Sequence, residues 1–157
     1  MPGKPPSKIG LFACCLALLA GCGTAPAPVE SVKRQPVDEP WYAEAVTQLN
    51  EIDREAESLF QRGKPDDAAA RIQQGEPLAS RLLSVPRPTL QATEAASDLD
   101  QLYGRMLLSN RRYGWARLQF QKNLARWKHW QPSTPETERR LRLAQAAIAE
   151  CDRHITE

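Results

Sequence analysis

Apolar residues recur every three or four positions from Trp41 to the end of the chain, a spacing that places them on one face of an α-helix. The first predicted helix carries Tyr42, Ala45, Leu49, Ile52, Ala56 and Leu59 on this face. Glycine and proline divide the periodic region, most clearly at Gly63-Lys64-Pro65 and Val85-Pro86-Arg87-Pro88. No run of residues reads as a β-strand, so the sequence predicts an all-α body of about five or six helices.

Local signals predict where the later helices begin and end. A second helix is expected to start at Asp66-Asp67 and to break at Gly75-Glu76-Pro77, which leaves a short helix before a third one over residues 89–109. Asn110 is the predicted left-handed cap between the third and fourth helices. Ser133 is the predicted cap of the last helix, whose apolar face carries Leu141, Ala144, Ile148, Cys151 and Ile155.

Two helix pairs share a pattern of small and apolar residues. In one pair Gly104 precedes Ala116 by twelve residues, and Phe120 follows four positions later. In the other pair Ala56 precedes Ala68 by the same twelve residues, with Gly63 at the turn. The pattern resembles the tetratricopeptide repeat, in which small residues let two helices approach closely and an aromatic side chain packs between them.

This resemblance implies two divergent helical hairpins over roughly residues 41–130, with an inserted short helix. The sequence departs from the family in three respects, one of which is that no proline closes either hairpin at the expected place. Asp100 stands where the repeat has tryptophan, and 48 residues separate Ala68 from Ala116, where tandem copies recur at 34. The alternative is a plain helical bundle whose small residues allow close packing.

The amino-terminal segment has a different character. Lys4 and Lys8 accompany an apolar run, residues 9–20, that is too short to cross a hydrocarbon core of roughly 30 Å. The run ends in Leu19-Ala20-Gly21-Cys22, which resembles the lipobox of bacterial lipoproteins. The resemblance implies that residues 1–21 are a signal peptide and that Cys22 becomes the acylated first residue of the mature chain. The alternative is a cleaved secretory peptide followed by an incidental cysteine.

The residues after Cys22 predict where the protein resides. Gly23 replaces the aspartate that resembles an inner-membrane retention signal in lipoproteins, which favours the outer membrane with the body on the periplasmic side. The proline-rich residues 22–40 are the predicted tether, and residues 41–157 are the predicted helical domain. We therefore expect the protein to be held at the membrane by lipid rather than by a membrane-spanning helix.

Charge is unevenly distributed along the mature chain. Residues 22–100 carry a net charge of −6 and residues 101–157 carry +6, with no acidic residue between Gln101 and Pro135. On the predicted fourth helix, a stripe of Trp115, Lys122 and Arg126 lies apart from the core-facing aromatic residues, and it predicts a binding face for an anionic partner. Export argues against nucleic acid. The alternative is that these basic residues pair with the acidic half and that Trp115 packs beneath a neighbouring helix.

Nothing in the sequence predicts catalysis, a metal site or a cofactor. His129 and His154 lie 25 residues apart, with no cysteine or carboxylate at metal-ligand spacing. Cys151 is predicted to be buried. We expect a helical interaction or scaffold module with an envelope protein as its partner. The alternatives are a structural lipoprotein that binds peptidoglycan or anionic lipid directly, and a cell-wall hydrolase, which needs two carboxylates brought together in a cleft.

Overall fold

The computed structural model describes residues 35–156, which form a short 3₁₀ turn and five α-helices and include no β-strand. This confirms the predicted all-α class. The elements are η1 (Pro36–Asp38), α1 (Pro40–Gln61), α2 (Pro65–Leu83), α3 (Leu90–Ser109), α4 (Tyr113–Lys128) and α5 (Pro135–Thr156). The predicted signal peptide, Cys22 and most of the predicted tether lie outside the described residues. No helix from residue 35 to 156 is long and apolar enough to cross a membrane.

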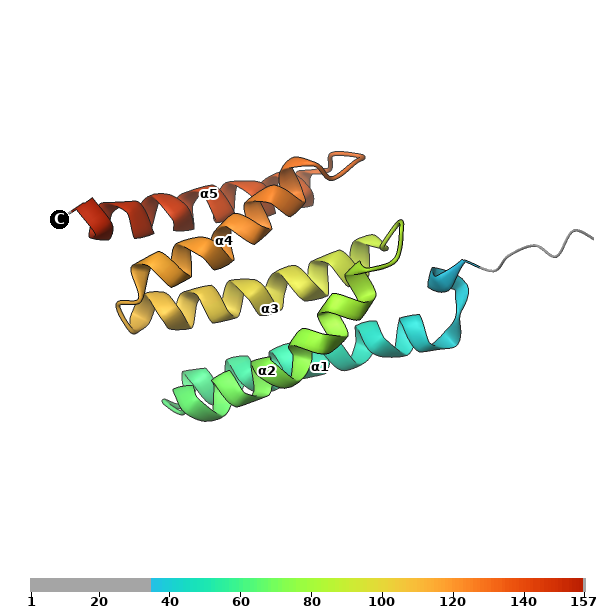
Figure 1. Ribbon diagram of the computed structural model, residues 1–157, viewed down its shortest axis with the longest axis horizontal. Helices are drawn as coiled ribbons and strands as arrows, with labels where there is room; N and C mark the ends of the chain where they lie inside the picture. Colours follow the sequence, from blue (N-terminus) through green and yellow to red (C-terminus); the bar gives the residue numbers. More distant parts are fainter. Residues whose placement is uncertain (1–34, 157) are drawn as a thin grey trace, which may run out of the picture. The chain divides into compact units, whose positions relative to one another are not determined.

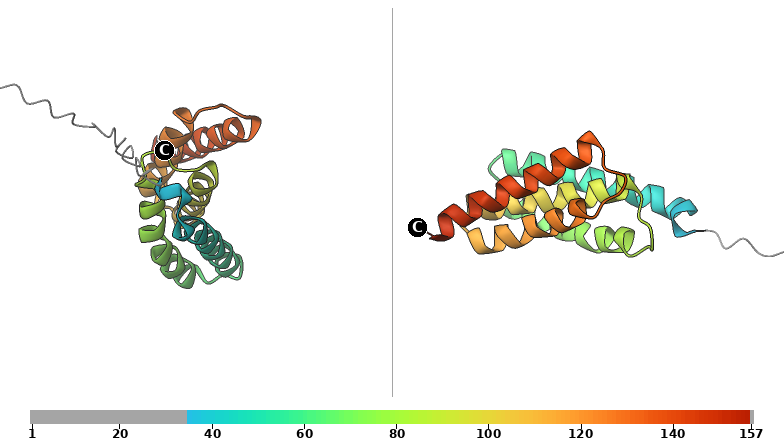
Figure 2. Two further views of the ribbon diagram at one scale, coloured as in Figure 1. Left: turned by 90° about the vertical axis from the view of Figure 1, so that its right-hand side faces the viewer. Right: turned by 90° about the horizontal axis from the view of Figure 1, so that it is seen from above.

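Successive helices pair along the chain. α1 packs on α2, α3 packs on α4 and also contacts both α1 and α2, and α5 packs on α4. Within residues 35–156, α2 and α4 lie on one side of α3, while α1 and α5 lie on the other (Figures 1 and 2). The α1–α2 and α3–α4 turns share one end of this arrangement with the end of α5 (Figure 1).

Residues just before Trp41 also pack against the helical body. Val37 of the 3₁₀ turn packs against the core, and α1 begins at Pro40. Tyr42 then ties α1 to the loop that follows α2. Its hydroxyl donates a hydrogen bond to the Leu82 carbonyl at 3.3 Å and accepts one from the Thr89 amide at 3.1 Å. Both ends of the predicted interruption at residues 85–88 are thereby fixed.

The predicted break in the second helix is wrong, and there is no inserted short helix among the described residues. α2 runs continuously from Pro65 to Leu83 with Pro77 inside it. A β-carbon added at the buried Gly75 would lie 3.0 Å from both Ile52 and Leu99, so α2 approaches α1 and α3 closely there. Packing on two sides of the helix outweighs the roughly 3 kcal/mol that an internal proline costs.

Two predicted caps are also wrong, each by one residue. The backbone of Asn110 is not left-handed (φ −87°); the left-handed residue is Arg111, with φ 57°. Thr134, rather than Ser133, caps α5, because Thr134 and Thr137 each accept the other's backbone N–H with the side-chain hydroxyl. A left-handed residue follows α3, and a hydroxyl side chain caps α5. The sequence pattern does not determine which of two neighbouring positions takes each role.

Most of the buried apolar residues form two clusters. The larger one joins α1, α2 and α3, and the predicted apolar face of α1 contributes to it throughout. The smaller one consists of Ala116, Phe120 and Cys151, packed on by residues from α3 and α5. Ile155 was predicted to lie in the core but is 51% exposed, because α5 extends past the start of α4 at that point.

The five residues of the predicted hairpin pattern lie in a turn or where paired helices meet. Gly63 lies in the α1–α2 turn with φ 73°, and Ala68, Ala116 and Phe120 are fully buried. Gly104 lies directly beneath the Phe120 ring. The relationship to tetratricopeptide repeats itself stays a prediction, since close helix packing also fits a plain bundle.

We predict that Gly104→Ala lowers the free energy of unfolding by about 1–3 kcal/mol, because overpacking outweighs the better helix propensity of alanine. The added β-carbon would lie 2.5 Å from Cε1 of Phe120. Gly114→Ala is the matched control in α4, since nothing lies within 4 Å of its added β-carbon, and it should stabilise by up to about 1 kcal/mol. Urea unfolding of both variants measures the difference, and equal effects would contradict the close approach of α3 and α4.

Candidate functional site

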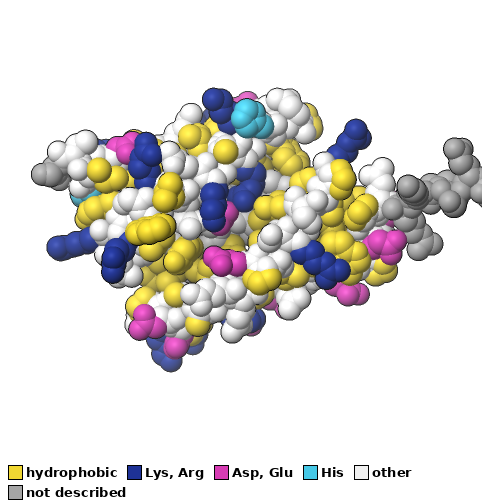
Figure 3. Space-filling model, in the orientation of Figure 1, with side chains coloured by type: hydrophobic (Ala, Val, Ile, Leu, Met, Phe, Trp, Pro, Cys, Tyr) yellow, Lys and Arg dark blue, Asp and Glu magenta, His cyan; other side chains and the backbone are white. Residues whose placement is uncertain are grey.

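A groove separates α2 from α4, and α3 forms its floor. We call it the α2–α4 groove; its volume is about 320 Å³. Figure 3 views this face of the molecule, where basic and acidic side chains lie among apolar surface. The lining residues are Glu76, Ala79, Ser80 and Leu83 from α2, Ala96, Leu99 and Asp100 from α3, and Lys122 and Arg126 from α4.

Asp100 is the electrostatic centre of this groove. One of its carboxylate oxygens accepts a hydrogen bond from Arg126 at 3.0 Å, and the other lies 3.5 Å from the Lys122 ammonium. The Arg126 side chain is only 15% exposed, whereas the Lys122 side chain is 53% exposed. Two predicted binding residues therefore pair with the acidic half of the chain, yet Lys122 remains open to solvent.

A buried polar network fixes the basic wall of the groove. Nδ2 of Asn123 donates to the Ser97 carbonyl at 3.0 Å, and Nε1 of Trp127 donates to the Ser97 hydroxyl at 2.9 Å. Arg126 also donates to Oδ1 of Asn123. Because a buried polar group left without a partner is costly, this network holds α4 in register with α3. Sequence reasoning missed Asp100 and Asn123, since only the packing of α3 on α4 shows that they meet the basic residues.

Trp115, the third predicted binding residue, lies outside the groove. Its side chain is 64% exposed, so it does not pack beneath a neighbouring helix. Leu118, one turn further along α4, is 50% exposed. The predicted stripe is thus divided into a groove-lining part and an exposed part near the α3–α4 turn.

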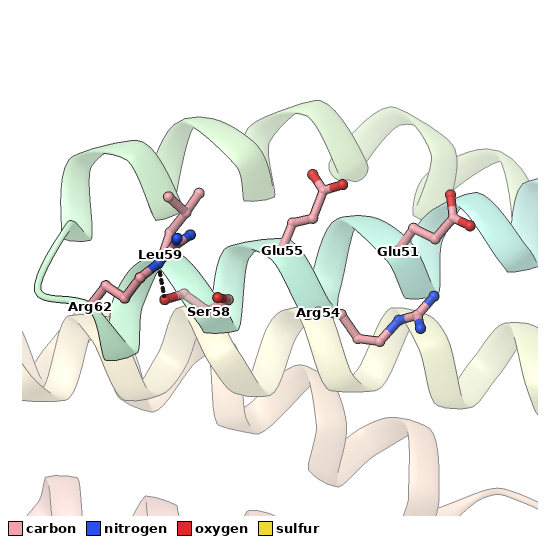
Figure 4. Close-up of a pocket in the computed structure, with 6 residues that line it drawn as sticks. All are labelled: Glu51, Arg54, Glu55, Ser58, Leu59 and Arg62. Atoms are coloured by element: carbon pink, nitrogen blue, oxygen red, sulfur yellow. Dashed lines mark hydrogen bonds between the residues drawn. The ribbon is translucent and has the colours of Figure 1, made fainter.

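A second recess, of about 610 Å³, lies along the exposed face of α1 (Figure 4). Its lining residues all come from α1 and the residue directly after it: Glu51, Arg54, Glu55, Ser58, Leu59 and Arg62. Arg54 and Arg62 each donate to a backbone carbonyl four residues earlier. A polar outer face of this kind keeps the end of a helical stack soluble, so we do not assign it a binding role.

A cluster of carboxylates lies where α1 meets α3. Burial, together with the negative charges of Asp98 and Glu57, raises the pKa of Asp53 from 3.8 to about 6, while Arg105 opposes this shift. Oδ1 of Asp53 is buried and accepts no hydrogen bond. Sequence patterns do not indicate this cluster, because 45 residues separate Asp53 from Asp98.

The histidines and Cys151 do not combine into a site. Within residues 35–156, no three His, Cys, Asp or Glu side chains are grouped so that they could hold a metal ion. His154 stacks on Tyr113 with ring centroids 4.5 Å apart and lies 3.2 Å from a Glu150 carboxylate oxygen. The prediction that Cys151 is buried is confirmed, and burial raises the pKa of its thiol.

Comparison of the chain with protein-family models, with curated proteins and with solved structures finds no match in any of the three.

We predict that wild-type stability falls as the pH rises from about 4 to about 6. The raised pKa means that folded Asp53 holds its proton where the unfolded chain has lost it, so ionisation above pH 6 costs the fold about 3 kcal/mol. Asp53→Asn should remove this dependence and raise the melting temperature at pH 7.

The titration of Glu136 does not obscure the pH dependence that Asp53 causes. Its pKa is lowered to about 2, chiefly by its hydrogen bond from Arg139, so its stabilising contribution is lost only below about pH 4.5. Urea unfolding of wild type and Asp53→Asn at a series of pH values between 4 and 7 isolates the Asp53 effect. Identical pH dependence in both proteins would show that Asp53 is not buried beside these charges.

Proposed function

We propose that the chain is an outer-membrane lipoprotein whose helical domain is a protein-interaction module on the periplasmic side. Leu19-Ala20-Gly21-Cys22 after a basic start and a short apolar run supports acylation of Cys22. Several acyl chains on one residue give stable attachment, at about 0.8 kcal/mol for each buried methylene. The anchor confines the domain to one surface and raises its effective concentration for partners at that surface.

The α2–α4 groove is the observation that carries the interaction role. Its accessible apolar lining is Ala79 and Leu83 of α2, above the buried floor, and its two walls bear opposite charges, with Glu76 on α2 and Lys122 on α4. An amphipathic segment of a protein partner fits this arrangement, with its apolar face on these α2 side chains and a carboxylate near Lys122. Since Lys122 pairs with Asp100 only at 3.5 Å and is half exposed, it can accept a second anion at little cost.

Direct binding to peptidoglycan is an alternative use of the same groove. Sedimentation with purified sacculi separates the two, because a protein partner is absent from that mixture. Binding to sacculi that Lys122→Gln abolishes would favour peptidoglycan over a protein partner.

One observation favours the hydrolase alternative. Asp53 and Asp98 are two carboxylates brought together from different helices, and the pKa of Asp53 is raised to about 6, as in a general acid. However, Asp98 is engaged by Arg140, and Oδ1 of Asp53 is buried. Release of soluble fragments from sacculi by wild type but not by Asp53→Asn would establish this alternative.

We predict that a photo-crosslinking residue at Ser80, on the groove wall, traps an envelope protein in cells. The same residue at Ser58, on the exposed face of α1, is the matched control and should trap much less. Lys122→Gln should lower the yield from Ser80 while changing stability by less than about 0.5 kcal/mol, as exposed ion pairs usually do. The wild-type yield should also fall as salt is added, because salt screens exposed charges.

Arg126→Gln separates the structural part of the groove from the binding part. It leaves Asp100 and Asn123 without their partly buried donor, so it should lower stability by about 1–2 kcal/mol. Equal yields from Ser80 and Ser58, unaltered by Lys122→Gln, would contradict the proposed groove.

We predict that Cys22→Ser abolishes metabolic labelling with a fatty acid and leaves an uncleaved or soluble protein. The reason is that the lipid attaches through the cysteine sulfur, which serine lacks. Labelling that persists in this variant would remove the basis for the membrane anchor.

A further inference from the structure

The α1–α2 and α3–α4 turns have the same backbone structure. In the first turn the amides of Gly63 and Lys64 bond to the carbonyls of Phe60 and Leu59 at 3.0 Å each. In the second turn, 48 residues later, the amides of Arg111 and Arg112 bond to the equivalent Leu108 and Leu107 carbonyls at 3.0 and 2.8 Å. Each pattern is the Schellman arrangement that ends a helix with one left-handed residue.

The left-handed position is occupied by glycine in one turn and by arginine in the other. Gly63 has φ 73°, and Arg111 has φ 57°. A side chain in this region is disfavoured, so glycine is the residue that suits the turn itself. The first hairpin therefore shows that the fold does not require arginine at position 111.

The exposed surface beside the turn also differs between the two hairpins. Four positions of the first hairpin, Gly63, Lys64, Asp67 and Ala70, correspond at 48 residues to Arg111, Arg112, Trp115 and Leu118 of the second. We call the latter four the turn patch. All four are exposed, including Trp115 at 64% and Leu118 at 50%. Compared with the first hairpin, the turn patch has two more large apolar side chains and one more positive charge, and it lacks the acidic side chain of Asp67.

The arginines of the turn patch have no partner of their own. Neither side chain forms a hydrogen bond or an ion pair within residues 35–156. Asp66 lines the same recess as Arg112 without pairing with it, and Arg117 of α4 pairs with Asp152 of α5 at 2.6 Å. Lys122 and Arg126, further along α4, are engaged by Asp100, whereas no ion pair among the described residues compensates the positive charge of the turn patch.

We propose that the turn patch contacts an anionic phospholipid surface. Guanidinium groups bind phosphate, and tryptophan lies preferentially at the boundary between headgroups and acyl chains. Trp115 and Leu118 are exposed side chains one turn apart on α4, so both can insert among lipid headgroups. The proposal rests on the lipid anchor at Cys22 proposed above, because an anchored domain needs only a weak second contact to lie against the bilayer.

The predicted tether allows this contact. The residues from 23 to 35 reach up to about 40 Å when extended, at about 3.1 Å per residue. The 22-residue α1 separates η1 from the turn end by about 33 Å. The turn patch can therefore reach the surface in which Cys22 is anchored, and the α2–α4 groove further along α4 is left open to a protein partner.

Quenching of tryptophan fluorescence by brominated phospholipids tests the proposal with the full acylated chain reconstituted in vesicles. Trp115→Phe identifies the part of the signal that belongs to Trp115, since the chain has four tryptophans. In vesicles of equal parts phosphatidylglycerol and phosphatidylcholine, we expect Trp115 to be quenched. In vesicles of phosphatidylcholine alone, or at high salt, the quenching should fall sharply.

Three variants test whether the lipid contact depends on positive charge and on where that charge lies. The double variant Arg111→Gln with Arg112→Gln should lower the equilibrium constant for contact between the turn patch and the bilayer roughly thirtyfold, as expected when two basic residues near an anionic surface are removed. Arg54→Gln with Arg87→Gln removes the same charge from exposed positions away from the turn end and should leave Trp115 quenched. Arg111→Gly restores the residue of the first hairpin, so it should keep or raise the melting temperature while weakening the contact.

The outcomes distinguish this proposal from the anchor on which it rests. A protein that stays on the vesicles with Trp115 unquenched overturns the lipid contact and leaves the anchor standing. A protein that is not retained by the vesicles overturns both. A photo-crosslinking residue at position 115 that traps a protein in cells, with no lipid quenching, would make the turn patch a protein interface instead.

Discussion

The contact between the Phe120 ring and the backbone of Gly104 sets how closely α4 approaches α3, and the other features of α4 depend on that distance. Three and seven residues after Phe120, the side chains of Asn123 and Trp127 reach Ser97 on α3. Arg126, on the flank of the same helix, reaches Asp100. A side chain at position 104 would push α4 outward, and the buried hydrogen bonds to Ser97 would lengthen with the groove.

The sequence predicts the apolar faces well and the boundaries less well. The periodicity identified the buried faces of α1 and α3, because one face of a helix repeats at fixed spacing. It failed at Pro77, where packing around Gly75 overrides a local helix breaker, and at Ile155, which lies past the neighbouring helix. The pairing of Asp100 with Lys122 and Arg126 could be anticipated only in kind, since charge counts do not say which carboxylate meets which cation. The Asp53 cluster depends wholly on tertiary packing.

The two hairpins provide an internal comparison that separates structural from functional residues. Where both need the same residue type, as at Ala68 and Ala116, the position is buried and serves packing. Where they differ at exposed positions, as between Gly63 and Arg111, the fold tolerates either residue. In the second hairpin Arg111 adopts the left-handed backbone conformation at some cost in stability. This supports a binding role for its side chain rather than a structural one.

A lipid-anchored domain with a groove on one part of α4 and a cationic, apolar patch on another would face the bilayer in a defined orientation. Neutron reflectometry of the acylated protein on a supported bilayer containing phosphatidylglycerol measures this most directly, because it gives the depth of water between headgroups and protein. If the turn patch contacts lipid, the protein layer adjoins the headgroups and separates from them at high salt. A layer of water beneath the domain under every condition would contradict it.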